Sequence, residues 1–436
     1  MGISIKKSIK KFVPASVWDW FHYRRLALME NPIIDTYQTR YDNTISNLRN
    51  KKSIRVFFFA IYHSNWKYDS LFQLMLEDDY FDPIVLICPS IVRDRNHELE
   101  SRQQCIDFFT EKQYPFVCAY DDKKNTYLNP HTLNADIIFF TNPYKGLVHP
   151  DYYIDRFTDA LTCYVSYGFC NVKYRWSVAS MFHQCLWRFY VECNENMKQI
   201  RQLASNNGMN CRVVGYPMYD TLVANLHTHG GGLWKSDDKN LKRIIWAPHH
   251  TVSNHLELLQ LSTFEKYADF MWHLAEKYKS LVQFVFKPHP LLKANLTNLP
   301  SWGKEKTEAY YNKWANGENT ALSDGEYVDL FLSSDAMIHD CGSFIIEYLY
   351  TKKPVMYLVG HDRNEQSNEI GNLAYDVHYH ATSESEIESF VENVVLRNND
   401  TMLSLRERFF NEHLVPPNGK SVAQNIIDDI KQSLTL

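Results

Sequence analysis

The chain has 436 residues, of which 45% are hydrophobic and 22% are charged, and its formal net charge at pH 7 is −5. A chain of this length exceeds one ordinary hydrophobic core, so we expect two domains. The negative charge argues against a nucleic-acid partner. The nine cysteines are scattered singly, without the paired Cys or His spacing of a zinc site, which favours a reducing compartment and no metal.

Residues 1–35 form a basic, aromatic N-terminal segment. Lysines alternate there with apolar residues, and tryptophans and arginines follow: Lys6, Lys7, Lys10 and Lys11 among Ile3, Ile5, Ile9, Phe12 and Val13, then Val17, Trp18, Trp20, Phe21, Arg24 and Arg25. No apolar run has the length of a membrane span, and no secretory signal is visible. Two interpretations stay open for a cytoplasmic protein: a peripheral anchor on the anionic inner face of the plasma membrane, or packing of the aromatics onto the first domain.

Residues 36–227 alternate apolar runs with amphipathic stretches, which predicts a doubly wound, Rossmann-like α/β domain. The apolar runs are expected to be buried parallel strands at 55–62, 84–88, 116–119, 136–140, 161–165, 189–192 and 212–214. Helices are expected at about 71–75, 96–109 and 195–205. Ligands meet such a sheet at the loops that follow its strands, and these loops carry His63, Asn142, Tyr144, Tyr164 and Tyr167.

The polar, glycine-rich stretch 228–242 is expected to be a linker. Residues 243–400 then start a second β/α alternation, with strands expected at 243–247, 282–286, 336–339 and 355–359. Helices are expected at 264–278, 326–333 and 384–395, and another at 422–434 within the C-terminal residues 401–436.

The stretch 334–358 predicts a β-turn-α-β unit, with a helix that opens at Ser343 and is stopped by Pro354. Gly342 permits close approach of a ligand to the backbone, and the free N–H groups of a first helical turn favour an anion. Glu347 lies on the same helix face as Ser343, where it can accept a hydrogen bond from a sugar hydroxyl. A phosphate with an attached ribose fits this pattern. In the alternative interpretation Ser343 is only an N-cap and Glu347 a solvated helix residue.

Three strand ends of the second half carry cationic or hydrogen-bonding residues. His249 and His250 follow the first of these strands, Lys287 and His289 the second, and Asp340, Gly342 and Ser343 the third. The ends of parallel strands converge on one edge, so these groups are expected to surround one helix N-terminus. Backbone N–H groups, a lysine charge and imidazoles together suit a diphosphate.

These same residues carry a resemblance to a known family. The elements Ala247-Pro248-His249-His250-Thr251, Lys287-Pro288-His289-Pro290 and Ser334-Asp335 through Asp340-x-Gly342-Ser343-x-x-x-Glu347-Tyr348-Leu349-Tyr350-Thr351-x-Lys353-Pro354 resemble the CDP-glycerol glycerophosphotransferase family. This family contains the teichoic-acid and capsule polymerases of GT-B fold. The resemblance is strongest over residues 243–360 and looser in the first half.

The resemblance implies two Rossmann-like domains that face a cleft, with a nucleotide-diphospho donor held by the second and C-terminal helices that cross back to the first. It implies transfer without a bound metal or other cofactor. By the same resemblance His289 contacts the donor phosphates and assists the leaving group, Gly342 and Ser343 bind the diphosphate, and Glu347 binds the ribose. His249, His250 and Thr251 line the donor pocket, beside Lys287. Our candidate catalytic residues are His289, His63 and Asp340.

One element of the family pattern is missing. The family's polymerases carry a His-Gly-Thr-Pro-x-Lys element that supplies the expected catalytic base, whereas the corresponding region here, 163–169, contains no histidine. We take His63 as the substitute base, with a loop histidine of no role as the alternative. The expected function is transfer of glycerol phosphate, or a similar polyol phosphate, to a polymer or lipid-linked acceptor in teichoic-acid or capsule synthesis. Two alternatives are a GT-B glycosyltransferase that uses a nucleotide sugar for capsule or lipopolysaccharide, and a non-catalytic GT-B scaffold.

Overall fold

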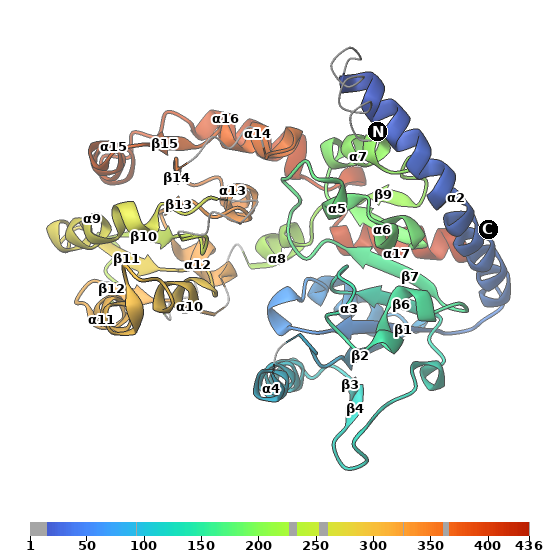
Figure 1. Ribbon diagram of the computed structural model, residues 1–436. Coiled ribbons are helices and arrows are strands. Elements are labelled where there is room, and N and C mark those ends of the chain that lie inside the picture. Colours follow the sequence, from blue (N-terminus) through green and yellow to red (C-terminus); the bar gives the residue numbers. More distant parts are fainter. Residues whose placement is uncertain are drawn as a thin grey trace, which may run out of the picture. The chain divides into compact units, whose positions relative to one another are not determined.

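The computed structural model describes residues 15–92, 94–225, 233–252, 260–325, 327–360 and 366–435. The chain divides into two compact units. Unit 1 contains the chain up to Gly168, Tyr174–Pro217 and the chain from Pro416 on, and unit 2 contains Phe169–Lys173 and Met218–Val415. Each unit is built on a parallel sheet with helices, which confirms the predicted α/β class with two Rossmann-like units (Figure 1).

Unit 1 has a seven-stranded parallel sheet in the order β3-β2-β1-β6-β7-β8-β9. Its strands are β1 (Ile54–Ala60), β2 (Phe81–Ile87), β3 (Phe116–Cys118), β6 (Ile137–Phe140), β7 (Leu161–Val165), β8 (Arg188–Val191) and β9 (Cys211–Val213). Its helices include α3 (Asp69–Leu76), α4 (Arg95–Glu111), α5 (Arg175–Val178), α6 (Met181–Cys185) and α7 (Asn194–Leu203). The seven expected strands are all present to within a few residues. The short hairpin of β4 (Tyr120–Asp121) and β5 (Thr126–Tyr127) was not expected.

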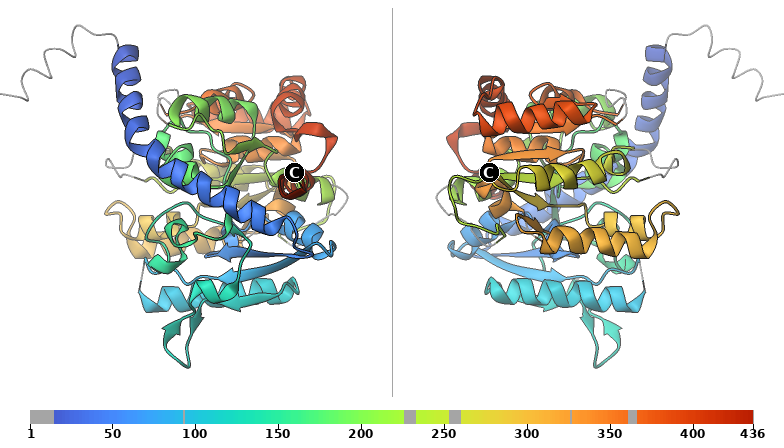
Figure 2. Two further views of the ribbon diagram at one scale, coloured as in Figure 1. Left: turned by 90° about the vertical axis from the view of Figure 1, so that its right-hand side faces the viewer. Right: turned by 90° about the vertical axis from the view of Figure 1, so that its left-hand side faces the viewer.

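Two helices distant in sequence complete unit 1. Helix α2 (Ala15–Leu48), dark blue in Figure 2, packs against α6, β7 and α17 (Val422–Thr435). The Tyr41 hydroxyl donates to the Cys185 carbonyl (2.7 Å), and the buried Glu30 carboxylate accepts from Arg175 (2.5 Å). Lys431 of α17 pairs with Asp78 (2.5 Å).

Helix α2 runs across residue 35, where the sequence placed a boundary. The lysines that define the basic segment lie outside the described residues, as do the side chains of residues 15–23. None of the described helices is both long and apolar enough to cross a membrane.

Unit 2 has a six-stranded parallel sheet in the order β12-β11-β10-β13-β14-β15. Its strands are β10 (Lys242–Ala247), β11 (Val282–Phe286), β12 (Thr320–Leu322), β13 (Ala336–His339), β14 (Val355–Leu358) and β15 (Tyr379–Ala381). Its helices are α8 (Met218–Asn225), α9 (Phe264–Lys277), α10 (Leu292–Thr297), α11 (Gly303–Asn316), α12 (Val328–Ser333), α13 (Phe344–Glu347), α14 (Glu369–Tyr375), α15 (Glu384–Ser389) and α16 (Leu403–Phe409). Counted along the unit, this is the Rossmann order 3-2-1-4-5-6, whose switch point lies between β10 and β13.

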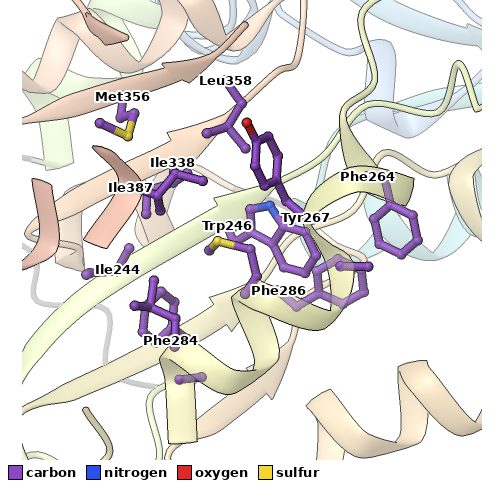
Figure 3. Packing of buried hydrophobic residues seen from close by; sticks show 14 of the residues in the cluster. Ile244, Trp246, Phe264, Tyr267, Phe284, Phe286, Ile338, Met356, Leu358 and Ile387 are labelled. Atoms are coloured by element: carbon purple, nitrogen blue, oxygen red, sulfur yellow. The ribbon is translucent and has the colours of Figure 1, made fainter. Parts of the chain in front are cut away.

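An aromatic core supports the central strands of this sheet. The Trp246 ring stacks on Phe286 (4.9 Å between centroids) and on Phe264 (5.7 Å). Figure 3 shows these three side chains within the buried cluster. Helix α9 contributes buried residues at helical spacing: Phe264, Tyr267, Ala268, Met271, Leu274 and Ala275. Full burial of such large side chains contributes about 1.5–3 kcal/mol each. This packing gives the loops after β10 and β11 a rigid base.

The unit boundaries differ in three places from the predicted ranges 36–227, 228–242, 243–400 and 401–436. Helix α8 belongs to unit 2, where the Tyr219 ring lies 6.2 Å from that of Phe410. Residues 401–415 also belong to unit 2, and the chain returns to unit 1 only at Pro416. Residues 169–173, from the middle of the first half, belong to unit 2 as well. Contacts between residues distant in sequence decide these boundaries, whereas the composition of the predicted linker marks only the polar stretch after α8. Residues 228–232 of the predicted linker lie outside the described part of the chain.

Candidate active site

The three strand ends that carry cationic or hydrogen-bonding residues meet at the switch point of unit 2. Ala247 of β10 lies level with His339 of β13, so the residues that follow each strand are neighbours. On the other side, Lys287 N–H donates to the Trp246 carbonyl (2.8 Å) and His289 N–H donates to the Pro248 carbonyl (3.0 Å). These two hydrogen bonds prolong the pairing of β10 and β11 beyond the strands. The structure therefore brings together the groups that the sequence predicted at one sheet edge.

Three histidines form a cluster at this edge. The ring centroids of His249 and His250 are 4.3 Å apart, those of His250 and His289 4.2 Å, and those of His249 and His289 5.2 Å. One ring nitrogen of each lies within 4.8 Å of those of the other two. Such a cluster can serve an anion or a metal ion, and the protons on the rings decide between them.

The hydrogen bonds at the Nδ1 atoms indicate where these protons lie. Leu291 N–H donates to Nδ1 of His289 (3.2 Å), so Nδ1 carries a lone pair and the neutral ring carries its proton on Nε2. The Asn295 amide donates to the carbonyl of His250 (2.9 Å) and lies 3.4 Å from its Nδ1, which favours the same tautomer.

The Thr251 hydroxyl lies at Nδ1 of His249 and indicates the tautomer of this ring as well. The Thr251 hydroxyl oxygen accepts from Leu261 N–H (3.0 Å) and Ser262 N–H (3.1 Å), and it lies 3.1 Å from Nδ1 of His249. Because two donors occupy its lone pairs, the hydroxyl proton is left for Nδ1. We therefore assign Nε2–H tautomers to all three histidines.

His289 is uncharged, and the adjacent charge comes from Lys287. Burial, followed by the neighbouring His250 and Lys287, lowers the pKa of His289 to about 3. His289 is thus an uncharged hydrogen-bond donor at physiological pH. The Lys287 side chain is buried beside it. Imidazole N–H groups around one ammonium group suit phosphate oxygens.

A metal ion fits these tautomers poorly. A histidine that binds a metal through Nε2 has no proton there and normally donates from Nδ1 to an acceptor. Here Nδ1 faces the donors Leu291 N–H and the Asn295 amide. The arrangement therefore favours an anion.

Asp340 joins the ends of β13 and β10 and the start of α9. Its Oδ1 accepts from His249 N–H (2.5 Å), and its Oδ2 accepts from the N–H (2.5 Å) and hydroxyl (2.8 Å) of Thr263. The side chain is fully buried, and burial raises its pKa to about 6 in spite of these hydrogen bonds, which lower it. This geometry fits a residue that positions the histidine loop. The catalytic role given to Asp340 in the sequence stays a prediction.

The turn after Asp340 presents Gly342 and Ser343. Within the described part of the chain, the Ser343 hydroxyl makes no capping hydrogen bond, and it lies 3.7 Å from the Cys341 sulfur. The N-cap alternative therefore lacks its defining contact. Helix α13 is shorter than expected, because the chain tightens to a 3₁₀ turn at Tyr348–Thr351 and ends at Lys352 with φ 59°.

Glu347 is buried and hydrogen-bonded, unlike a solvated helix residue. It is 2% exposed, and the Tyr327 hydroxyl donates to its Oε2 (2.6 Å). Ser343 and Glu347 are four residues apart and follow β13 at the switch point. A ribose contact by Glu347 remains a prediction that this location supports.

His63 lies in unit 1. It opens a short 3₁₀ turn (His63–Asn65) after β1, its side chain is half-buried, and its ring lies 5.7 Å from that of Phe108. This is the ligand-receiving edge of a doubly wound sheet. The role of His63 as a base stays a prediction.

Three residues that orient the site were not foreseen from the sequence: Thr263, Asn295 and Tyr327. Each donates a hydrogen bond to a predicted site residue: Thr263 to Asp340, Asn295 to His250 and Tyr327 to Glu347. Asn295 follows the Lys-Pro-His-Pro element by five residues, the only one of the three near a recognised motif. The other two become neighbours of the site through folding alone.

Two doubly wound units in one chain, with this constellation at the switch point of the second, define a protein of the GT-B class. Solved structures of similar fold include a Listeria monocytogenes protein assigned as a UDP-N-acetylglucosamine 2-epimerase (TM-score 0.56, 11% identity, 88% of this chain and 96% of that chain). The wall teichoic acid polymerase TagF, in a variant soaked with CDPG, is similar at TM-score 0.53 and 15% identity, over 95% and 97% of the two chains. UDP-GlcNAc 2-epimerase from Neisseria meningitidis bound to UDP-GlcNAc is similar at TM-score 0.52 and 12% identity, over 87% and 99%.

The family follows from the sequence match. Residues 180–429, more than half of the chain, match the family described as CDP-Glycerol:Poly(glycerophosphate) glycerophosphotransferase. The chain belongs to this family, and it is a transferase of the glycerophosphotransferase type. The match confirms the resemblance that the strand-end residues indicated. No curated protein sequence matches the chain.

Proposed function

We propose that the protein moves glycerol phosphate, or a similar polyol phosphate, from a CDP-activated donor to a cell-surface polymer. The observation that carries the proposal is the cluster of three histidine rings, among them the uncharged His289, beside Lys287 and within the segment that matches the family. A nucleoside diphosphate offers the phosphate oxygens that such donors bind. The polymerase TagF, solved after soaking with CDPG, supports a cytidine donor and a teichoic-acid product.

In the proposed reaction an acceptor hydroxyl attacks the phosphorus atom that carries glycerol. The bond from this phosphorus to the bridging oxygen breaks, CMP leaves with the bonding electrons, and the hydroxyl proton passes to a base, for which His63 is our candidate. Negative charge grows on the departing CMP oxygens. The Nε2–H of His289 and the Lys287 ammonium stabilise that charge, while Gly342 and Ser343 hold the diphosphate. Asp340 positions the backbone of His249 and takes no proton in this scheme.

A second candidate is a GT-B glycosyltransferase that uses a nucleotide sugar for capsule or lipopolysaccharide. Two observations favour it. Residues 163–169 lack the base element of the family's polymerases, and epimerases of UDP-GlcNAc share the fold. The two candidates differ in the donor that they bind.

We propose the inner face of the plasma membrane as the site of action, with a lipid-linked or polymeric acceptor. Helix α2 supports membrane contact: Leu28, Met29 and Ile33 are 75%, 63% and 50% exposed, beside exposed Arg24 and Arg25. At about 100° per residue, Leu28 and Met29 lie roughly 100–160° away from Glu30 and Ile34, and Ile33 lies at the edge of that buried face. An apolar stripe with flanking arginines suits an anionic bilayer surface.

Calorimetric titration with CDP, CMP, CDP-glycerol, CDP-ribitol, UDP-sugars and GDP-sugars tests the proposal. We expect cytidine-selective binding that His289→Ala and Ser343→Ala each weaken by about 10–100-fold, because hydrogen bonds to charged groups are worth about 1.5–3 kcal/mol. His273→Ala, which alters an exposed histidine of α9, is the matched control and should bind like the wild type. Selective binding of uridine or guanosine nucleotides would favour the second candidate, a glycosyltransferase that uses a nucleotide sugar. If the protein binds none of these nucleotides, a non-catalytic scaffold is favoured.

A further inference from the structure

A five-residue segment from the first half of the chain is built into unit 2. Strand β7 of unit 1 ends at Val165, and the chain continues through Gly168 into Phe169–Lys173, which belong to unit 2. At Tyr174 the chain returns to unit 1. The segment begins at Phe169, the last residue of the region 163–169 that departs from the family pattern.

Backbone hydrogen bonds hold this segment against the start of α14. Val172 and Ser367 form an antiparallel bridge, and Lys173 N–H donates to the Gln366 carbonyl (3.1 Å). Asn368 N–H donates to the carbonyl of Asn171 (3.1 Å).

Asn368 and Gly371 complete this attachment. The Asn368 amide donates to the Cys170 carbonyl (3.2 Å), while its side-chain oxygen accepts from Gly371 N–H (2.9 Å). A Cβ at Gly371 would lie only 2.6 Å from the Asn171 carbonyl oxygen, so this close approach requires glycine. The segment is therefore fixed at several points.

From this fixed segment, Asn171 reaches the turn of the proposed donor site. Its side chain is buried (7% exposed), and Nδ2 donates to the carbonyl of Gly342 (2.5 Å). The peptide bond between Gly342 and Ser343 is planar and trans, so its C=O and N–H point in opposite directions. A hydrogen bond that holds the Gly342 carbonyl therefore also fixes the direction of Ser343 N–H.

We propose that Asn171 is a positioning residue for the donor turn, which fixes the Gly342–Ser343 peptide bond where the diphosphate of a nucleotide donor binds. The inference rests on the proposed function for the identity of the ligand. The part of the inference that concerns the orientation of the turn rests on the contacts of Asn171 and does not depend on the ligand. The chain thus uses a residue next to the β7 loop of unit 1 to order the binding turn of unit 2.

Two variants and one control test the proposal. Asn171→Ala removes the donor, and Asn171→Asp keeps the shape but places a carboxylate oxygen against the Gly342 carbonyl. Asn319→Ala is the matched control, because Asn319 is equally buried (4% exposed) and its amide donates to two backbone carbonyls of unit 2, those of Ala275 (3.0 Å) and Val282 (2.9 Å). Hydrogen exchange of a peptide that covers residues 341–347 and the Kd for CDP-glycerol are measured for each.

We expect faster exchange in residues 341–347 and a Kd raised about 10-fold or more in both Asn171 variants, with Asp no better than Ala. Asn319→Ala should lower the Tm and leave both readouts near wild type.

Unchanged exchange in the Asn171 variants would overturn the inference. Equal changes in the Asn319 control would also overturn it, because Asn171 would then have only a general structural role. A wild type that binds no cytidine nucleotide would reject the proposed function, and the exchange measurement would still decide the role of Asn171. Should Asn171→Ala not fold, the isosteric Asn171→Asp supplies the same two readouts.

Discussion

The Oδ1 atom of Asp340 accepts a hydrogen bond from the backbone N–H of His249 at 2.5 Å, across 91 residues of sequence. This contact links the ends of two adjacent strands, and Oδ2 links the same carboxyl to the start of α9 through Thr263. The position of the histidine cluster therefore depends on a group that itself points away from solvent.

Replacement of Asp340 should cost both stability and donor affinity. Asp340→Ala leaves three donors of His249 and Thr263 without their acceptor, and each unsatisfied buried donor costs about 1–3 kcal/mol. We expect a loss of about 3 kcal/mol in the free energy of unfolding, measured by urea denaturation. Asp340→Asn should also destabilise the protein, because its NH₂ group must face a donor. Wild-type stability in both variants would contradict the positioning role.

Acidification should destabilise the protein through His289. Its folded-state pKa of about 3 lies below the ordinary 6.5, so the unfolded chain binds more protons than the native chain between these values. The contribution of His289 is intact above pH 6.5 and is lost as the pH falls toward 3. Asp340 acts in the opposite direction, because its raised pKa of about 6 costs stability as the pH rises from 3.8 through 6.

The variant His289→Gln isolates the contribution of His289 to the pH dependence of stability, since glutamine keeps an N–H donor and does not titrate. We expect the stability of the variant relative to the wild type to improve as the pH is lowered from 7.5 to 4.5, in urea titrations at several pH values. Parallel stability curves for the two proteins would show that His289 is not held neutral.

The tautomers predict that the histidine cluster holds no tightly bound metal. We expect elemental analysis of the purified protein to find less than stoichiometric zinc, nickel or cobalt, and dialysis against EDTA to leave donor affinity unchanged. One equivalent of zinc that is lost in His249→Ala and His250→Ala would contradict the tautomer assignment, because metal binding at Nε2 requires a lone pair there.

If Glu347 binds the ribose, the penalty of its replacement should depend on the ligand. We expect the wild type to bind CDP about 10-fold more tightly than its 2′- or 3′-deoxy analogue, since a hydrogen bond to a carboxylate is worth about 1.5–3 kcal/mol. In Glu347→Gln this ratio should approach one. Tyr327→Phe removes the hydroxyl that donates to Oε2 and is the control that keeps the carboxylate. A ratio that survives in Glu347→Gln would assign Glu347 a structural role.

The sequence predicted the sheet elements well because fully buried parallel strands need continuous apolar runs, as in β1 and β11. Strands β12 and β15 are three residues long and sit at the two edges of the sheet, where no such run is required. The site histidines were predictable because they follow central strands directly. Asn171 was not, because its contact with Gly342 spans 171 residues and depends on a backbone path that crosses between units.

Membrane contact through the basic residues that precede α2 can be tested without damage to the fold if the deletion ends before the helix. Removal of residues 1–30 would take away Glu30, whose buried carboxylate holds Arg175 (2.5 Å) and Ser205 (2.6 Å), so loss of binding could then reflect unfolding. Deletion of residues 1–14 leaves this network in place. We expect the truncated protein to lose sedimentation with vesicles of anionic lipid while it keeps its Tm.

The exposed stripe of α2 supplies the second half of the test. Leu28→Ser, Met29→Ser and Ile33→Ser together should weaken vesicle binding several-fold, since each removes apolar area from the face that meets the bilayer. Thr36→Ser and Thr39→Ser, on exposed residues of the same helix, are the matched control. Vesicles of zwitterionic lipid should bind all versions weakly, because the basic residues then lack their partner. Equal sedimentation of wild type and both altered proteins would leave the N-terminal aromatics as packing against unit 1, which is the other interpretation of this segment.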